Sequence, residues 1–173
     1  MKRTILTFSI LIILIQYSYS QCEDYLYSVD QARTYIINAY EYADESYSYS
    51  RKAYNADELE DAQHYAKKAM KHADDARDEA SSAESSANDA QSYAFECGCE
   101  DGESYSLDAI SFTEGAYSNA QDIYSYARKA YYADNLDDVQ YYSKKAMNSA
   151  EDTQSEASSA EDSLNDAESS CDN

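Results

Sequence analysis

The feature that most limits the fold of this chain is a run of small residues spaced alternately three and four positions apart. This spacing matches the a and d positions of a heptad repeat, which form one stripe along an α-helix. The chain has no proline and only three glycines, so little in it interrupts a long helix. We call this stripe the alanine seam: Leu59, Ala62, Ala66, Ala69, Ala73, Ala76, Ala80, Ala83, Ala87, Ala90 and Ala94.

The alanine seam belongs to a duplicated sequence. Residues 50–92 align with residues 127–169 at an offset of 77, without a gap. The same offset relates Cys22 to Cys99 and Tyr40 to Tyr117. An internal duplication predicts two copies of one structural unit. We place a signal peptide at 1–20, the first unit at 21–97 and the second unit at 98–173.

Each unit is expected to be a helical hairpin, because a second heptad stripe at 29–53 precedes the seam. A short polar segment separates the two runs, and Asp57 with Glu60 matches the capping pattern of a helix start. Asp134 and Asp137 repeat the arrangement in the second unit. The prediction is an all-α fold, a tandem pair of antiparallel, alanine-rich coiled-coil hairpins that can pack as a four-helix bundle.

The four cysteines fit this hairpin geometry. Cys22 continues the first helix backward and Cys97 continues the second helix forward, so an antiparallel hairpin brings them together. We therefore predict the disulfides Cys22–Cys97 and, from the repeat, Cys99–Cys171. A zinc site is the competing interpretation. However, the Cys-x-Cys spacing is not Cys-x-x-Cys, and neither histidine is near in sequence, so no metal is expected.

The first residues resemble an export signal. A short basic start is followed by an apolar stretch at 5–15 and by small residues before a cleavage point after Ser20. A retained membrane anchor is the alternative, but the apolar stretch is shorter than a spanning helix needs. The sequence thus predicts a secreted or periplasmic protein without membrane insertion after cleavage.

The charge of the chain limits its partners. After the predicted cleavage, 11 basic residues remain against 34 acidic ones. Long-range repulsion then disfavours nucleic acid and anionic membranes, whereas a cationic protein partner is favoured. The same excess can serve solubility alone. Composition would also allow disorder, but the heptad periodicity argues for folded helices.

Tyrosines and acids make up the candidate binding surface. Tyrosines repeat every seven residues on the two flanks of the seam, where they either cover the thin seam and join the hairpins or grip a partner. Acids beyond the last lysine of the second unit are the candidate contacts for a cationic protein, and neutralising them should slow its association. The candidate residues are Tyr35, Tyr42, Tyr49, Tyr40, Tyr47, Tyr54, Tyr117, Tyr124, Tyr131, Glu151, Asp152, Glu156, Glu161 and Asp162.

No residue pattern indicates catalysis or a cofactor. The two histidines, His64 and His72, lack a nucleophile or metal motif, and three glycines cannot form a phosphate loop. The leading hypothesis is a non-enzymatic protein-binding role, for example as an immunity or inhibitor protein for a basic partner. The alternatives are a structural component of a secreted matrix or coat, which would self-associate, and a low-affinity binder of divalent cations.

Overall fold

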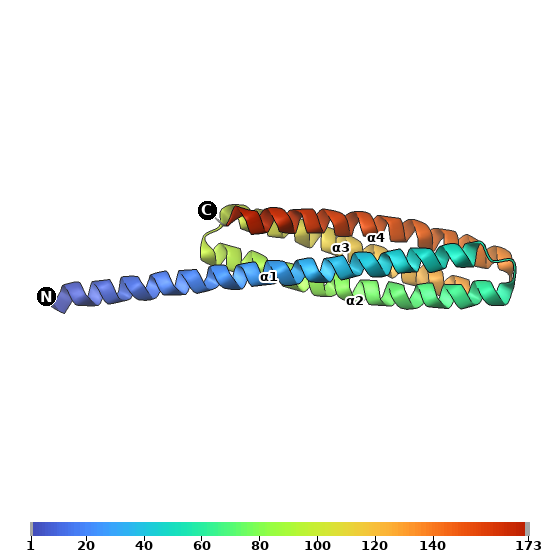
Figure 1. Ribbon diagram of the computed structural model, residues 1–173, viewed down its shortest axis with the longest axis horizontal. Helices are drawn as coiled ribbons and strands as arrows, with labels where there is room; N and C mark the ends of the chain where they lie inside the picture. The colour runs from blue at the N-terminus through green and yellow to red at the C-terminus, as the bar shows by residue number, and fades with distance from the viewer. Residues whose placement is uncertain (1, 172–173) are drawn as a thin grey trace.

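The computed structural model describes residues 2–171 of the chain and the side chains of residues 22–171. Successive helices run in opposite directions, and the described residues contain no strand, which confirms the predicted all-α hairpin fold (Figure 1). Residues 2–20, the predicted signal peptide, begin the first helix and extend beyond the bundle. The four helices are α1 (Lys2–Tyr54), α2 (Leu59–Cys97), α3 (Glu100–Tyr131) and α4 (Leu136–Ser170).

The two hairpins pack together as one four-helix bundle. Helix α1 packs against α2 and α4, and α3 packs against the same two helices, while the diagonal pairs hardly touch. Both hairpin loops lie at one end of the bundle, which we call the loop end (Figure 1). The α2–α3 connection and the end of α4 lie at the opposite end, which we call the cysteine end. Along the described chain, no helix has a stretch both long and apolar enough to cross a membrane.

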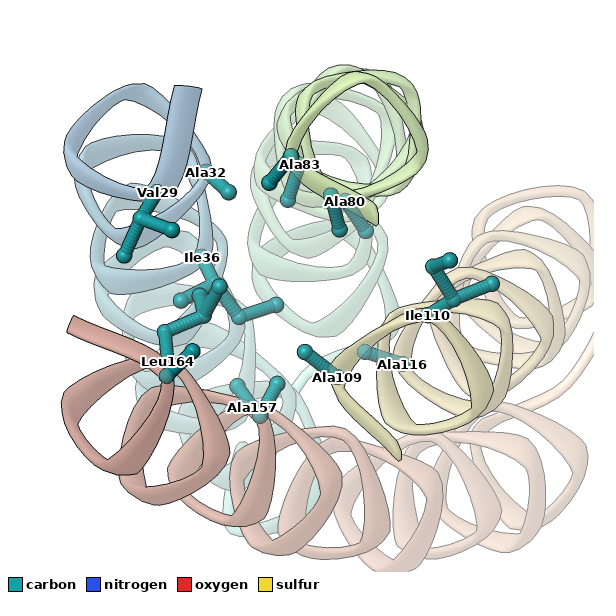
Figure 2. Packing of buried hydrophobic residues seen from close by; sticks show 14 of the residues in the cluster. Val29, Ala32, Ile36, Ala80, Ala83, Ala109, Ile110, Ala116, Ala157 and Leu164 are labelled. Carbon is teal, nitrogen blue, oxygen red and sulfur yellow. The ribbon is translucent and has the colours of Figure 1, made fainter. Parts of the chain in front are cut away.

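The core is built on the alanine seam. Every seam alanine from Ala62 to Ala94 is at most 1 % exposed. Larger apolar side chains from the other helices, including Val29, Ile36 and Leu164, fill the space that these small residues leave (Figure 2). An alanine buries little apolar area at about 25 cal/mol per Å². The bundle therefore depends on contacts other than its seam for much of its stability.

Reciprocal hydrogen bonds join the two hairpin loops. The Gln63 side-chain amide of α2 donates to the Ala133 carbonyl at 2.8 Å. In the opposite direction, the Gln140 amide of α4 donates to the Ala56 carbonyl at 3.3 Å. The offset of 77 relates the two donors and also the two acceptors, so the pair follows the internal duplication. We call this pair the loop clasp.

The predicted capping residues are one position too early. Helix α2 begins after Glu58 and α4 after Asn135, whereas the sequence pattern favoured Asp57 and Asp134. The Asn55 and Ala56 amides still bond back to the last turn of α1, which moves the chain reversal one residue onward. The Asn135 carboxamide oxygen accepts from the Asp138 amide at 2.9 Å. Glu58, its counterpart in the first unit, makes no side-chain cap.

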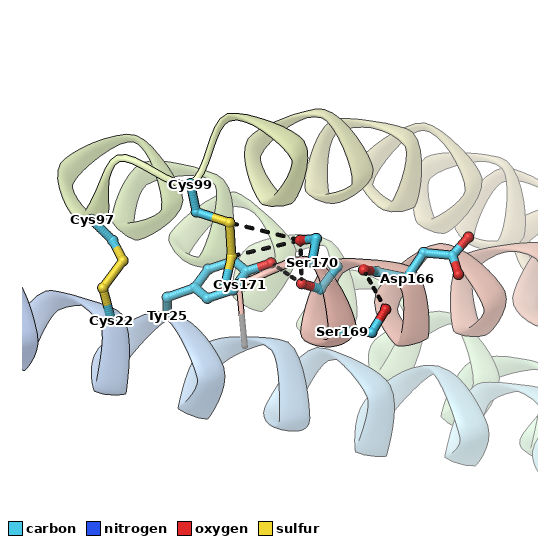
Figure 3. Close-up of a disulfide and its surroundings, with 9 residues drawn as sticks. Cys22, Tyr25, Cys97, Cys99, Asp166, Ser169, Ser170 and Cys171 are labelled. Carbon is cyan, nitrogen blue, oxygen red and sulfur yellow. Dashed lines mark hydrogen bonds between the residues drawn. A yellow bond between two sulfur atoms is a disulfide. The ribbon is translucent and has the colours of Figure 1, made fainter. Parts of the chain in front are cut away.

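Both predicted disulfides are confirmed at the cysteine end. Cys22–Cys97 joins the two helices of the first hairpin, and Cys99–Cys171 joins those of the second (Figure 3). All four cysteines are used within their own hairpin, so neither bond joins one hairpin to the other.

A single buried tyrosine links the hairpins at this end. The Tyr25 hydroxyl donates to the Ala167 carbonyl at 2.6 Å (Figure 3). Burial raises the pKa of this hydroxyl above its ordinary value. The ring occupies space over Gly102, where an added Cβ would lie 2.6 Å from the hydroxyl oxygen and 2.7 Å from the Cys171 sulfur. Gly102 thus gives Tyr25 its place between the hairpins.

Candidate binding groove between α1 and α4

The tyrosines on one flank of the seam lie between the two paired helices of a hairpin. The rings of Tyr42 and Tyr49 on α1 stack on His72 of α2, with ring centroids 6.3 and 5.3 Å from the imidazole. The Oε2 atom of Glu45 lies 2.7 Å from Nδ1 of the same histidine. In the second hairpin, Lys145 of α4 lies 5.6 Å from the ring centroid of Tyr126 on α3. These rings cover the seam between paired helices.

Several rings of the other flank lie where the two hairpins meet. The Arg77 guanidinium of α2 is 5.8 Å from the Tyr124 ring of α3. Lys67 of α2 is 5.6 Å from the Tyr131 ring. Seven of the nine candidate tyrosines are partly buried: Tyr35, Tyr42, Tyr47, Tyr49, Tyr117, Tyr124 and Tyr131. Tyr40 and Tyr54 are the two exposed ones, so the nine do not form one free aromatic surface.

A groove between α1 and α4 brings Tyr40 together with one of the candidate acids. It has a volume of about 300 Å³ and is lined by Ile37, Tyr40 and Glu41 of α1 and by Ser158 and Glu161 of α4. Ile37 is 36 % exposed and Tyr40 is 43 % exposed. The groove, named here the α1–α4 groove, therefore combines two apolar side chains with two carboxylates.

Polar contacts between α1 and α4 bracket this groove along the helices. Toward the cysteine end, the Arg33 guanidinium donates to the Glu168 carboxylate. Toward the loop end, the Gln154 amide donates to Asp44 Oδ1 at 3.0 Å. These contacts hold the two walls of the groove at a fixed spacing. Since Ser158 on α4 is small, the space between the walls stays open.

The duplication supplies a natural comparison for the groove. The offset of 77 carries Ile37 to Glu114, Tyr40 to Tyr117 and Glu161 back to Glu84, which places the counterpart between α3 and α2. An acid replaces the isoleucine there, and Tyr117 is partly buried against the core. The apolar wall is thus a property of the α1–α4 side alone. Neither Ile37 nor Glu41 was singled out in the sequence, because their heptad positions are ordinary surface positions.

The five candidate acids do not form one patch. Glu161 lines the α1–α4 groove. Glu156 lies on the opposite side of α4, where a Cβ added at Gly115 of α3 would meet its carboxyl carbon at 3.0 Å. The other three, Glu151, Asp152 and Asp162, are exposed on α4. Of the five candidate acids, only Glu161 therefore lines the groove, where Glu41 of α1 is the second carboxylate.

Charge is unevenly distributed along the bundle. Within residues 22–171, nine of the eleven Lys and Arg side chains lie toward the loop end: Arg51, Lys52, Lys67, Lys68, Lys71, Arg128, Lys129, Lys144 and Lys145. The other two basic residues are Arg33 and Arg77, and each forms ion pairs with acidic side chains. The hydrogen bond from Arg77 to Asp78 raises the pKa of the arginine above its ordinary value. The field around the groove is accordingly negative.

An open hollow at the loop end contrasts with the groove. It measures about 510 Å³, and its lining includes Arg51 and Lys52 together with Asp57, Glu58 and Asp61. Because both bases and acids line it, this hollow has no marked preference for either sign of charge. Among the described residues, those of this hollow included, no three His, Cys, Asp or Glu side chains gather in a way that would hold a metal ion.

Comparison with known proteins gives no relative of this chain. No protein-family model, no curated protein and no solved structure matches it.

Proposed function

We propose that this chain is an exported, non-enzymatic binding protein that holds a cationic protein partner in the α1–α4 groove. The observation that carries the proposal is the meeting of exposed Ile37 and Tyr40 with Glu41 and Glu161 in one groove. A small acidic inhibitor or immunity protein for a basic enzyme or toxin would use such a surface.

The groove suits a lysine or arginine side chain of the partner. The methylene stem of such a residue packs on Ile37 and Tyr40, and its charged head reaches Glu41 or Glu161. A tyrosine face also attracts a cation, with about 0.5–1 kcal/mol at exposed sites. The surrounding negative field speeds encounter with a basic protein and repels acidic ones.

The test is a pull-down from the producing organism with the tagged full chain at moderate salt. The groove variant is Glu41→Gln with Glu161→Gln, and the matched control is Glu84→Gln with Glu114→Gln on the α2–α3 side. Both variants lose two negative charges, so they differ only in where the charge is lost. We expect a basic protein to bind the wild type and the control, and to bind the groove variant about 5–30-fold more weakly, equivalent to about 1–2 kcal/mol.

A second variant tests the apolar wall. Tyr40→Ala should weaken capture of the same partner by about 1–2 kcal/mol, because it removes a ring from the centre of the contact. Circular dichroism would establish that the variants keep their helix content. Equal loss of binding in the groove variant and the control would show that only total charge matters, and this result would contradict the proposed site.

A further inference from the structure

We propose that the α2–α3 side of the bundle has a separate docking surface near the cysteine end, and that it takes an apolar side chain presented by a basic helix of another protein. The surface consists of Phe95 at the end of α2, Leu107 on α3 and the hollow beside them, and we call it the end patch. It lies on the side opposite the α1–α4 groove, because the diagonal helix pairs hardly touch. The proposal does not depend on the proposed function.

The end patch contains the most exposed large apolar side chain of the described residues. Phe95 is 73 % exposed and Leu107 is 54 % exposed. Glu103 lines the same hollow as Phe95, and Leu107 lies one turn beyond Glu103 on the same face of α3. Single apolar side chains are common on protein surfaces, whereas a group of them beside a hollow is typical of an interaction site.

The internal duplication shows that the fold does not require apolar side chains at these two positions. The offset of 77 relates Leu107 to Asp30. Phe95 and Ser169 both lie two residues before the last cysteine of their unit, so they are also equivalent. Both counterparts are polar and exposed in the same bundle. Helix packing therefore does not explain Phe95 and Leu107, and contact with a partner does.

The hollow beside these residues suits a single side chain. It has a volume of about 190 Å³, whereas pockets for small-molecule ligands measure about 300–1,000 Å³. Its lining consists of Ala94, Phe95, Gly98, Cys99, Glu100 and Glu103. The Gly98 amide donates to the Phe95 carbonyl at 3.2 Å, and the Cys99 amide donates to the Ala94 carbonyl at 2.9 Å. The hollow is thus bounded by a fully bonded turn, and such a pre-formed site takes an anchor side chain at low entropic cost.

The charge around the end patch selects a basic partner. Residues 78–127, which include the whole patch, contain 11 acidic residues and no Lys, Arg or His. Glu100 and Glu103 line the hollow itself. A second copy placed patch to patch would bring the same acids face to face, and nucleic acid or an anionic membrane would be repelled. A helix that carries lysines beside an apolar anchor complements both the hollow and the acids.

The first test is a double-mutant cycle with two labelled helical peptides of about 15 residues, a length at which an isolated helix begins to form. One peptide has leucines on one face and lysines on the other, and its control has alanine at each leucine. The patch variant of the full chain is Phe95→Ser with Leu107→Asn, which makes both positions polar, as in the other unit.

Fluorescence anisotropy in 0.15 M NaCl measures the four affinities of this cycle. Changing leucine to alanine in the peptide should weaken binding to the wild type by about 5–30-fold, because the anchor is lost. The same change should leave binding to the patch variant unaltered. An equal loss with both proteins would overturn the proposal. Circular dichroism would establish that the variant keeps its helix content.

Two further variants show whether the leucine effect belongs to the end patch. Tyr132→Ser with Tyr141→Ser removes two exposed rings at the loop end, and this variant should keep the full effect. The groove variant Glu41→Gln with Glu161→Gln should keep it too, so the end patch is tested even if the α1–α4 groove binds nothing. Loss of the effect in the loop-end variant would contradict the site. Dimerisation of the wild type that the patch variant abolishes would show that a second copy covers the patch, and it would also overturn the proposal.

Discussion

At the scale of single residues, the two copies of the repeat have become complementary. Tyr25 and Gly102 occupy equivalent positions, and one is large where the other has no side chain. The tyrosine hydroxyl donates to the Ala167 carbonyl, so the largest fully buried side chain among residues 22–171 also makes a hydrogen bond between the hairpins. A duplication that kept the same residue at both positions would have either a clash or a cavity at this place.

Gly102→Ala is expected to destabilise the fold by about 1–3 kcal/mol, the usual cost of overpacking a filled site. The new Cβ would lie within 2.8 Å of Tyr25 and of both sulfurs of the second disulfide. Urea unfolding measures the change, and Ser104→Ala on the exposed face of the same turn of α3 is the control. The cost should shrink when Tyr25→Phe removes the nearest atom. An equal cost in both backgrounds would show that Tyr25 is not the obstacle.

At the scale of the helices, the two units differ in how their second helices begin. Asn135 caps α4 through its carboxamide, but the equivalent Glu58 leaves the first amides of α2 without a side-chain acceptor. This difference is visible only in the structure, because the acidic residues around both starts satisfy the capping pattern equally well. Helix α2 therefore has a weaker start than α4 in an otherwise similar hairpin.

Glu58→Asn should stabilise the protein by about 1 kcal/mol, because it copies the cap of the second unit into the first. The reverse change at the equivalent position, Asn135→Glu, should destabilise the protein by a similar amount. Thermal unfolding by circular dichroism measures both, and each substitution is the control for the other, since their charge changes are opposite. If both variants shifted the melting temperature in the same direction, charge or loop strain would outweigh capping.

The elements themselves could be predicted from the sequence, but their mutual side-chain contacts could not. The three-and-four spacing places the seam on one face of each helix, and the hairpin geometry then determines both disulfides. The rotation of one hairpin against the other is not contained in the heptad pattern. The loop clasp and the α1–α4 groove depend on that rotation, so Gln63 and Ile37 had no signal in the sequence. For the tyrosines, the sequence left two alternatives open, covering the seam or gripping a partner. Tyr42 and Tyr49 are partly buried within the first hairpin, and Tyr124 and Tyr131 are partly buried where the hairpins meet.

At the scale of the whole molecule, the formal net charge of −21 opposes folding. Most acids lie along the bundle away from the loop end, where few bases offset them. Compacting such a chain brings like charges within one Debye length of each other at low salt. The core of small residues has a limited hydrophobic gain with which to offset this repulsion.

Raising NaCl from about 0.01 to 0.15 M should therefore raise the melting temperature by about 2–8 °C, as the Debye length falls from about 30 to 8 Å. Scanning calorimetry measures this dependence. Glu84→Gln with Glu114→Gln removes two of the repelling charges, so the salt increment should be smaller in that variant. A melting temperature that falls with added salt would mean that the ion pairs stabilise the fold more than the repulsion opposes it.

At the cysteine end, the first hairpin starts close to where the second hairpin ends, and this closeness has a consequence for how the gene can be arranged. Cys22 and Cys171 border the same small cavity as Cys97, Gly98 and Cys99, so the start of the first hairpin lies beside the end of the second. A linker could join these two places while the chain is cut at Gly98. Such a circular permutant would present the hairpins in reverse order and keep every disulfide. The bundle therefore does not require that the first hairpin be synthesised before the second.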